Sequence, residues 1–178
     1  MNKKKLVTEM GRIDRDAFAQ SQKLPLVVVL DNVRSLHNVG SVFRTSDAFR
    51  VECIMLCGIT ATPPSAEIHK TALGAEDVVD WKYYESTMDA VVELRSQGYR
   101  IYSIELCQGS IALQDFVTAP GERYAVVLGN EVKGVQQDVV DASDGAIEIP
   151  QFGTKHSLNV SVTAGMVIWE FAKKLGLV

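Results

Sequence analysis

Short apolar segments, each followed by a helical pattern, recur along the chain, and this alternation restricts the fold more than any other feature. The run at 26–30, Leu-Val-Val-Val-Leu, is continuous, as is typical of a strand buried on both faces of a sheet. Strands that alternate with helices build α/β domains around a mainly parallel sheet. The sequence therefore predicts an α/β fold with a mostly parallel sheet flanked by helices.

The predicted elements fill one domain that follows a short extension. A chain of 178 residues can bury one sizeable core but not comfortably two. We therefore expect an N-terminal basic helical extension, 1–23, and a single domain, 24–178. Apolar runs predict strands at 26–30, 51–57, 78–83, 100–106, 124–128 and 146–149, and helical patterns predict helices at 38–49, 87–97, 136–142 and 157–175.

Charge is distributed unevenly between these two parts. The whole chain carries a formal net charge of −4, whereas residues 1–23 hold six basic and three acidic groups, a local excess of three positive charges. A segment of this kind can follow the phosphates of a nucleic acid. The alternative is an amphipathic helix that only covers the core.

Several chemistries lack their sequence signatures. Cys53, Cys57 and Cys107 lie in or beside apolar runs, which predicts buried free thiols in a reducing compartment and hence a cytoplasmic protein. No apolar run approaches the ~20 residues that span a bilayer, so we expect no membrane segment. The three histidines are scattered, so no metal site is expected. A dinucleotide glycine fingerprint, a P-loop and a nucleophile elbow are all missing.

Three polar loops follow predicted strands, at the ends where open α/β sheets bind ligands. The first enters a helix at residues 38–44, Asn-Val-Gly-Ser-Val-Phe-Arg, where Asn38 is the expected helix cap. The second is residues 129–134, Gly-Asn-Glu-Val-Lys-Gly. The third, residues 149–159, reads Ile-Pro-Gln-Phe-Gly-Thr-Lys-His-Ser-Leu-Asn and leads into a strongly apolar helix. Such junctions present backbone N–H groups and short polar side chains to a ligand.

Each loop also has a purely structural interpretation. Ser157 and Asn159 can act only as helix caps, and residues 129–134 can form a surface turn. Arg44 can pair with Asp47 on the helix surface, three residues away. Spacing alone leaves these alternatives open.

Taken together and in this order, the three loops resemble the SpoU family of the SPOUT superfamily, which are S-adenosylmethionine-dependent RNA ribose methyltransferases. The shared pattern is Asn-x-Gly-x-x-x-Arg, then Gly-x-Glu-x-x-Gly, then Ile-Pro followed by Ser-Leu-Asn-Val-Ser-Val. Similar stretches cover residues 26–50, 124–134 and 146–172. One position departs from the pattern, because many members have Met after the Ile-Pro where this chain has Gln151 and Phe152.

The resemblance implies a fold and an assembly. The C-terminal segment of a SPOUT domain threads into a deep trefoil knot, although alternation alone would predict an unknotted sheet. The resemblance also implies a homodimer, which agrees with a last helix that is apolar around most of its circumference. The alternative for that helix is a central position in a monomer. S-adenosylmethionine is the implied cofactor, and tRNA or rRNA is the implied partner.

Site residues follow from the same resemblance. The implied catalytic group consists of Arg44, Asn38, Glu131, Ser157 and Asn159. The implied cofactor cleft is lined by Leu106, Gly129, Ile149 and Leu158, largely through backbone groups. The family's proposed base is Arg44, but a guanidinium scarcely deprotonates in proteins, so an electrostatic clamp on ribose or phosphate is the alternative. Glu131 would orient Arg44 or Asn38.

The predicted function is methyl transfer from S-adenosylmethionine to a ribose 2′-OH in structured RNA. A non-catalytic RNA-binding protein that retains the fold is the alternative from another class. Methylation of a base nitrogen and a nicotinamide-dependent reaction are enzyme alternatives whose motifs are missing here. The sequence names neither the RNA nor the nucleotide.

Overall fold

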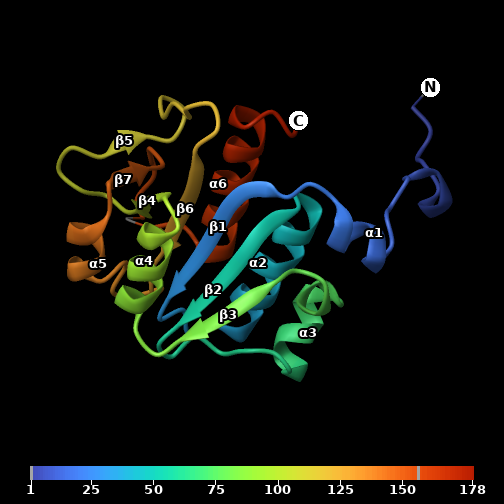
Figure 1. The fold of residues 1–178 in the computed structure, drawn as a ribbon, viewed down its shortest axis with the longest axis horizontal. Coiled ribbons are helices and arrows are strands. Elements are labelled where there is room, and N and C mark those ends of the chain that lie inside the picture. Colours follow the sequence, from blue (N-terminus) through green and yellow to red (C-terminus); the bar gives the residue numbers. More distant parts are fainter. Residues whose placement is uncertain (1, 156) are drawn as a thin grey trace.

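The computed structural model describes residues 2–155 and 157–178, and one seven-stranded sheet forms its centre. The order across the sheet is β3-β2-β1-β6-β4-β7-β5, and every neighbouring pair is parallel (Figure 1). The predicted mostly parallel sheet is confirmed. The strands are β1 (Leu24–Asp31), β2 (Val51–Cys57), β3 (Trp81–Tyr84), β4 (Tyr99–Ile104), β5 (Ile111–Ala112), β6 (Arg123–Leu128) and β7 (Gly145–Glu148).

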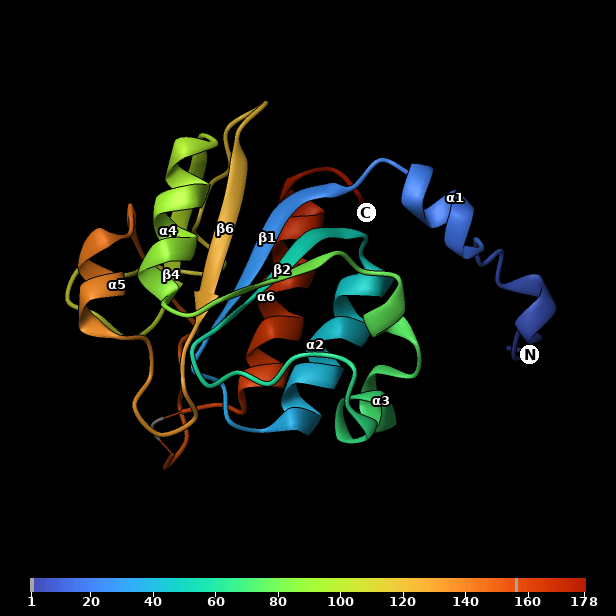
Figure 2. The same ribbon diagram turned by 60° about the horizontal axis from the view of Figure 1, so that its bottom comes forward.

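Helices cover both faces of the sheet. On one face lie α2, α3 and α6, and on the other lie α4 and α5 (Figures 1 and 2). In the described part of the chain, no helix is long and apolar enough to cross a membrane. The helices are α1 (Arg15–Gln20), α2 (Leu36–Ala48), α3 (Ala66–Ala72), α4 (Thr87–Ser96), α5 (Gln137–Ala142) and α6 (Val160–Lys174), with 3₁₀ turns η1 (Val7–Glu9) and η2 (Ala75–Asp77).

The central strand β1 explains why its sequence is continuously apolar. Leu26 and Leu30 belong to the core shared with α2, α3 and α6, whereas Val27 and Val29 belong to the core shared with α4 and α5. All four are at most 1% exposed. Because side chains alternate between the faces of a strand, a strand covered on both sides needs an apolar residue at every position.

Several predicted boundaries are wrong. Strand β3 begins at Trp81 rather than at residue 78, because the backbone N–H groups of Val78 and Val79 bond back to Ala75 in the turn that follows η2. Helix α2 begins at Leu36, and its cap is Ser35, whose hydroxyl accepts from the backbone N–H of Asn38. Asn38 therefore lies inside the first turn, not at the cap. Helix α6 begins at Val160 rather than at residue 157.

The N-terminal segment is anchored through Phe18 of α1. The Phe18 side chain is 4% exposed, and the Lys23 ammonium lies 3.4 Å from the centre of its ring. Arg15 pairs with Asp77 in η2 at 3.2 Å, although both side chains are largely exposed. Residues 2–13 are exposed wherever burial is described, and they lie to one side of the domain (Figure 2).

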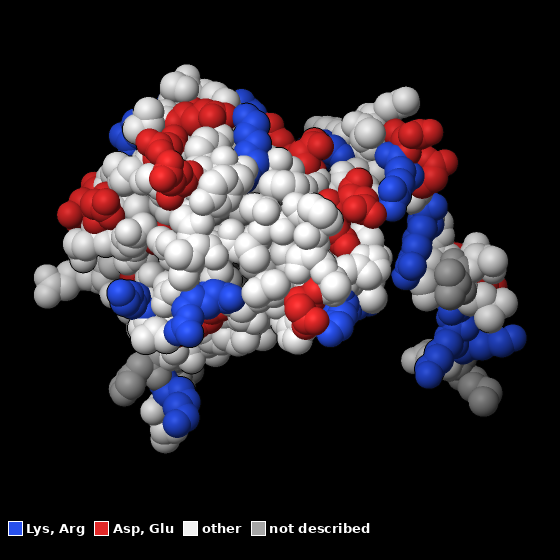
Figure 3. Space-filling view, turned by 90° about the horizontal axis from the view of Figure 1, so that it is seen from below, with Lys and Arg blue, Asp and Glu red and all other residues white. Residues whose placement is uncertain are grey.

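Strand order determines where a ligand site can form. From β1 the chain builds outwards through β2 to β3, and it then passes to β4 on the other side of β1. In open α/β sheets, ligands bind outside the carboxyl ends of the strands near such a reversal. Figure 3 views the molecule from the side towards which β1, β2 and β3 run.

Candidate functional site

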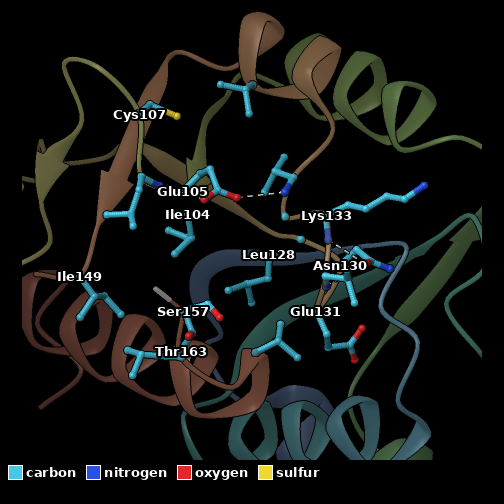
Figure 4. A pocket seen from close by; sticks show the side chains of 18 of the residues that line it. Ile104, Glu105, Cys107, Leu128, Asn130, Glu131, Lys133, Ile149, Ser157 and Thr163 are labelled. Carbon is cyan, nitrogen blue, oxygen red and sulfur yellow. Dashed lines mark hydrogen bonds between the residues drawn. The ribbon is translucent and has the colours of Figure 1, made fainter. Parts of the chain in front are cut away.

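A pocket of about 500 Å³ opens at the carboxyl ends of β4, β6 and β7 (Figure 4). Its apolar lining includes Ile104 and Leu128, the last residues of β4 and β6, and Val160 at the start of α6. All four residues predicted to bind the cofactor line this one pocket, namely Leu106, Gly129, Ile149 and Leu158. The structure thus gathers side chains from distant parts of the sequence around a single cavity.

The loop after β6 is a tight turn that its two glycines allow. Asn130 and Gly134 exchange backbone hydrogen bonds of 3.0 and 2.9 Å. A Cβ atom on Gly129 would lie 2.1 Å from the carbonyl carbon of Gly134, and Gly134 has a positive φ of +70°. A side chain at either position would therefore open the turn. The spacing Gly-x-Glu-x-x-Gly directs Glu131 outwards from the closed loop.

Glu131 holds the loop that precedes α2. Its Oε2 accepts from the backbone N–H of Arg34 at 2.9 Å, and its Oε1 accepts from the backbone N–H of Ser35 at 3.0 Å and from Nδ2 of Asn38 at 3.1 Å. Burial raises the pKa of the Glu131 carboxyl, but these donors outweigh burial, so the pKa lies below its usual value. Glu131 is therefore an ionised acceptor at neutral pH.

Asn38 connects Glu131 to the third loop. Its Oδ1 accepts from Nδ2 of Asn159 at 3.2 Å, while its own Nδ2 donates to Glu131. The Oδ1 atom of Asn159 accepts from the backbone N–H groups of Ser161 and Val162 at the start of α6. Asn159 thus caps α6 and also contacts Asn38. We call this set the Glu131–Asn38–Asn159 chain.

The other two predicted catalytic residues lie outside the Glu131–Asn38–Asn159 chain. Ser157 lines the pocket beside Leu158. Arg44 is exposed and lines a second hollow of about 720 Å³, between α2 and the N-terminal segment. Within residues 2–155 and 157–178, no hydrogen bond joins Arg44 to the Glu131–Asn38–Asn159 chain, and no ion pair joins it to Asp47. Within one chain the structure therefore assembles part of the predicted catalytic group.

Sequence reasoning missed a buried carboxylate behind the site. Asp31, the last residue of β1, is fully buried. It accepts from the backbone N–H and from Nε2 of Gln136, both at 2.8 Å, and from the hydroxyl of Thr87 at 2.6 Å. These contacts fix the end of the loop that carries Glu131. An acidic residue that directly ends an apolar strand is a signal that could have revealed it.

A second missed residue is Glu105, which follows β4 and lines the pocket. Its Oε2 accepts from the backbone N–H of Val135 at 3.1 Å. The apolar run at 100–106 predicts a strand through this position, which places Glu105 within the sheet. Strand β4 instead ends at Ile104, and Glu105 lines the pocket.

The cysteines offer no nucleophile. All three are free; Cys57 is buried, whereas Cys53 and Cys107 keep part of their surface exposed. Burial raises the pKa of the Cys53 and Cys57 thiols to about 12, and it also raises the pKa of Cys107, which lines the pocket. These thiols stay protonated at neutral pH. Among the described residues, no three His, Cys, Asp or Glu side chains gather closely enough to hold a metal ion.

Known proteins share this architecture. The tRNA (guanosine(18)-2′-O)-methyltransferase of Aquifex aeolicus is 30% identical over 158 residues, which cover 88% of this chain and 72% of the relative. The crystal structure of the A. aeolicus TrmH/SpoU tRNA modifying enzyme matches with a TM-score of 0.79 at 26% identity, over 92% of this chain and 81% of that one. The chain spans 68% and 65% of the length of two further curated relatives.

A solved structure with a bound cofactor is also similar. The S-adenosylmethionine-bound rRNA methyltransferase of Sinorhizobium meliloti matches with a TM-score of 0.78 at 26% identity, over 89% of this chain and 59% of that one. A model of the SpoU rRNA methylase family matches residues 25–169, which include all three loops. The chain belongs to the SpoU rRNA methylase family.

Proposed function

We propose that this protein transfers a methyl group from S-adenosylmethionine to a ribose 2′-hydroxyl of RNA. The observation that carries the proposal is that the pocket at the ends of β4, β6 and β7 adjoins the Glu131–Asn38–Asn159 chain. Glu131 lines the pocket and is also a member of this hydrogen-bonded set. A cofactor in the pocket would therefore lie beside ordered polar side chains that can position a substrate hydroxyl.

The pocket suits the cofactor in size and lining. Its volume of about 500 Å³ falls within the range of small-molecule sites. Ile104, Leu128 and Ile149 offer an apolar surface to an adenine ring, and the exposed backbone of the loop after β6 offers polar groups. When bound, S-adenosylmethionine supplies a methyl group already activated by a sulfonium, so the protein's task is alignment.

The Glu131–Asn38–Asn159 chain carries out this alignment. Glu131 fixes the amide of Asn38 by accepting from Nδ2, and Asn159 fixes the other end by donating to Oδ1. An amide held at both ends keeps one orientation. The Glu131–Asn38–Asn159 chain thus presents a preorganised polar surface to the ribose. This lowers the entropic cost of aligning the ribose 2′-oxygen with the methyl group.

The substrate assigned here is RNA. Phe152 is 98% exposed in the loop between β7 and α6, and Lys155 is exposed in the same loop. Exposed aromatic side chains stack on unpaired bases, and lysines neutralise phosphates. Lys and Arg side chains also lie along this face of the molecule and on the N-terminal segment, residues 2–23 (Figure 3). That segment is proposed to extend the RNA surface beyond the domain that begins at residue 24.

A homodimer completes the proposal. Helix α6 exposes Val162, Met166 and Trp169 by 49, 43 and 48%, in a stripe with helical spacing. An apolar stripe of this kind is typical of a subunit interface. Among the described residues, Arg44 of α2 makes no hydrogen bond to the Glu131–Asn38–Asn159 chain of its own subunit, and it lines a separate hollow beside the N-terminal segment. We therefore assign Arg44 as a phosphate or ribose clamp at the pocket of the partner subunit.

The proposal includes a knotted C-terminal segment and a cytoplasmic location. Strand β7 lies between β4 and β5, and the chain then passes to α6 on the face opposite α5. Such a path supports the deep trefoil knot that the family resemblance implies. The location follows from the substrate, because the named relatives are bacterial enzymes that act on tRNA or rRNA.

Single-turnover methyl transfer tests the function. RNA from a strain that lacks this protein is incubated with labelled S-adenosylmethionine and excess protein, and its nucleosides are resolved by mass spectrometry. We expect one 2′-O-methylated nucleoside to accumulate. A methylated base would instead identify base methylation, and RNA binding without any transfer would identify a non-catalytic binding protein.

A further inference from the structure

Glu105 places a carboxylate in the wall of the cofactor pocket. Its Oε1 accepts from the backbone N–H of Leu106 at 3.0 Å, and its Oε2 accepts from the backbone N–H of Val135 at 3.1 Å. Its own N–H donates to the carbonyl of Ile147 at 3.1 Å, which ties the residue to β7. Figure 4 shows Glu105 across the pocket from Glu131. Two backbone donors therefore hold the carboxylate in one orientation, and the backbone bond to Ile147 fixes the residue itself.

The loop after β6 leaves space for this carboxylate. Gly134 faces Glu105, and a Cβ atom built on Gly134 would lie 2.3 Å from Oε2. The second glycine of the Gly-x-Glu-x-x-Gly motif thus serves Glu105 as well as the turn.

Glu105 has no cationic partner among residues 2–155 and 157–178. Lys133 also lines the pocket, but its side chain extends away from Glu105 (Figure 4). A carboxylate has about four acceptor sites, and two backbone donors leave roughly half of them free. Glu105 is also partly buried, and a partly buried carboxylate gains from further donors. The free acceptor sites are therefore available to a ligand.

We propose that Glu105 accepts hydrogen bonds from the vicinal ribose hydroxyls of the bound nucleoside cofactor and so selects a ribonucleoside. This inference rests on the proposed function. The apolar surface of Ile104, Leu128 and Ile149 adjoins Glu105, so a base packed there brings its ribose to the carboxylate. Two neighbouring hydroxyls match two carboxylate oxygens, as in dinucleotide sites where an acidic residue binds the ribose.

The closest alternative is a contact with a cation, either the sulfonium or the α-amino group of the cofactor. A third possibility is that Glu105 only holds the loop through Val135. The three roles differ in what they predict for ligands that lack one hydroxyl or one charge. A comparison of ligands against variants therefore separates them.

The experiment is a binding cycle by calorimetry. Wild type, Glu105→Gln and the control Glu148→Gln are titrated with S-adenosylmethionine, with S-adenosylhomocysteine, and with the 2′-deoxy and 3′-deoxy forms of the latter. Glu148 is a carboxylate on the neighbouring strand β7 that hydrogen-bonds Ser110 and does not line the pocket. Wild type and Glu148→Gln should bind S-adenosylhomocysteine about 10-fold or more tightly than at least one deoxy form. In Glu105→Gln this preference should disappear.

Three results would overturn the inference. An undiminished ribose preference in Glu105→Gln would show that Glu105 acts on the loop alone. A selective loss of S-adenosylmethionine affinity, with S-adenosylhomocysteine unaffected, would identify a cation contact. Failure of wild type to bind either ligand would overturn the proposed function as well, which distinguishes the two failures. If Glu105→Gln does not fold by circular dichroism, Glu105→Asp, which draws the carboxylate back by one methylene, should reduce the preference in the same way.

Discussion

The side-chain amide of Asn159 donates to the side-chain oxygen of Asn38 over 3.2 Å, a contact between residues 121 positions apart in the chain. It links the cap of α6 to the first turn of α2. Asn38 accepts at one end and donates to Glu131 at the other, and its side-chain amide carries both the acceptor and the donor that these neighbours need. The loops after β1, β6 and β7 are thereby coupled through three side chains.

This coupling predicts non-additive effects on catalysis. Asn38→Ala and Asn159→Ala should each lower the single-turnover rate about 10-fold or more, and the double variant should be little worse than the poorer single variant. Residues that act as one unit give such behaviour. The check is a double-mutant cycle on the methylated nucleoside. Losses that multiply would show that the two asparagines act independently.

The lowered pKa of Glu131 predicts a pH-dependent contribution to stability. Its folded-state pKa lies below the unfolded value of about 4.3, so its stabilisation is fully present above that value and is lost as pH falls through the folded pKa. Glu131→Gln removes this pH-dependent contribution to the free energy of unfolding. Urea unfolding should therefore show wild type more stable than Glu131→Gln at pH 7, with the gap closing as the pH falls below about 4.3. A gap independent of pH would contradict the assignment.

Arg44 is predicted to act across the subunit interface. Arg44→Ala should nearly abolish transfer without weakening cofactor affinity, because Arg44 does not line the cofactor pocket. Arg44→Lys should rescue poorly, since an ammonium cannot reproduce the guanidinium fork. In dimers that combine one Arg44→Ala subunit with one Asn159→Ala subunit, one of the two pockets regains a full set of groups. Such mixed dimers should exceed both parents in activity, and dimers no better than their parents would place Arg44 at its own pocket.

The apolar stripe of α6 is predicted to be an interface. Trp169→Glu should convert a dimer into a monomer, because it would bury an unpaired charge. Val92→Glu on α4 is the matched control, since Val92 is 64% exposed on the opposite face. Light scattering at micromolar concentration should show a dimer for wild type and for Val92→Glu. A wild-type monomer would refute the assembly.

Gly40 is predicted to be a packing residue. A Cβ atom on Gly40 would lie 2.1 Å from Oγ1 of Thr71 and 2.3 Å from the carbonyl oxygen of Ile68, so α2 and α3 would have to separate. Gly40→Ala should lower the free energy of unfolding by roughly 1–3 kcal/mol, as overpacking does. Ser41→Ala, the next residue on the helix, should change it by less than ~0.5 kcal/mol. Equal stability of the two variants in urea would contradict close packing at Gly40.

Local sequence patterns were enough to predict the sheet and most of its strands. A continuous apolar run such as that of β1 indicates a strand buried on both faces. This pattern can be recognised in the sequence without knowing which strands lie beside it. The short elements α3 and β5 were not predicted. Both are too short to give a periodic signal in the sequence. Helix α3 has seven residues, about two turns, and strand β5 has two residues.

The candidate site was also only partly predictable from the sequence. The family resemblance implies four cofactor-cleft residues, and all four line the pocket. The contact between Asn159 and Asn38, and the position of Arg44 in another hollow, became visible only in the folded structure. The same is true of Asp31 and Glu105, which support the loop after β6. Strand order and helix packing set such distances, and both depend on contacts between residues far apart in sequence. A motif specifies which groups are present, whereas the fold specifies which of them meet.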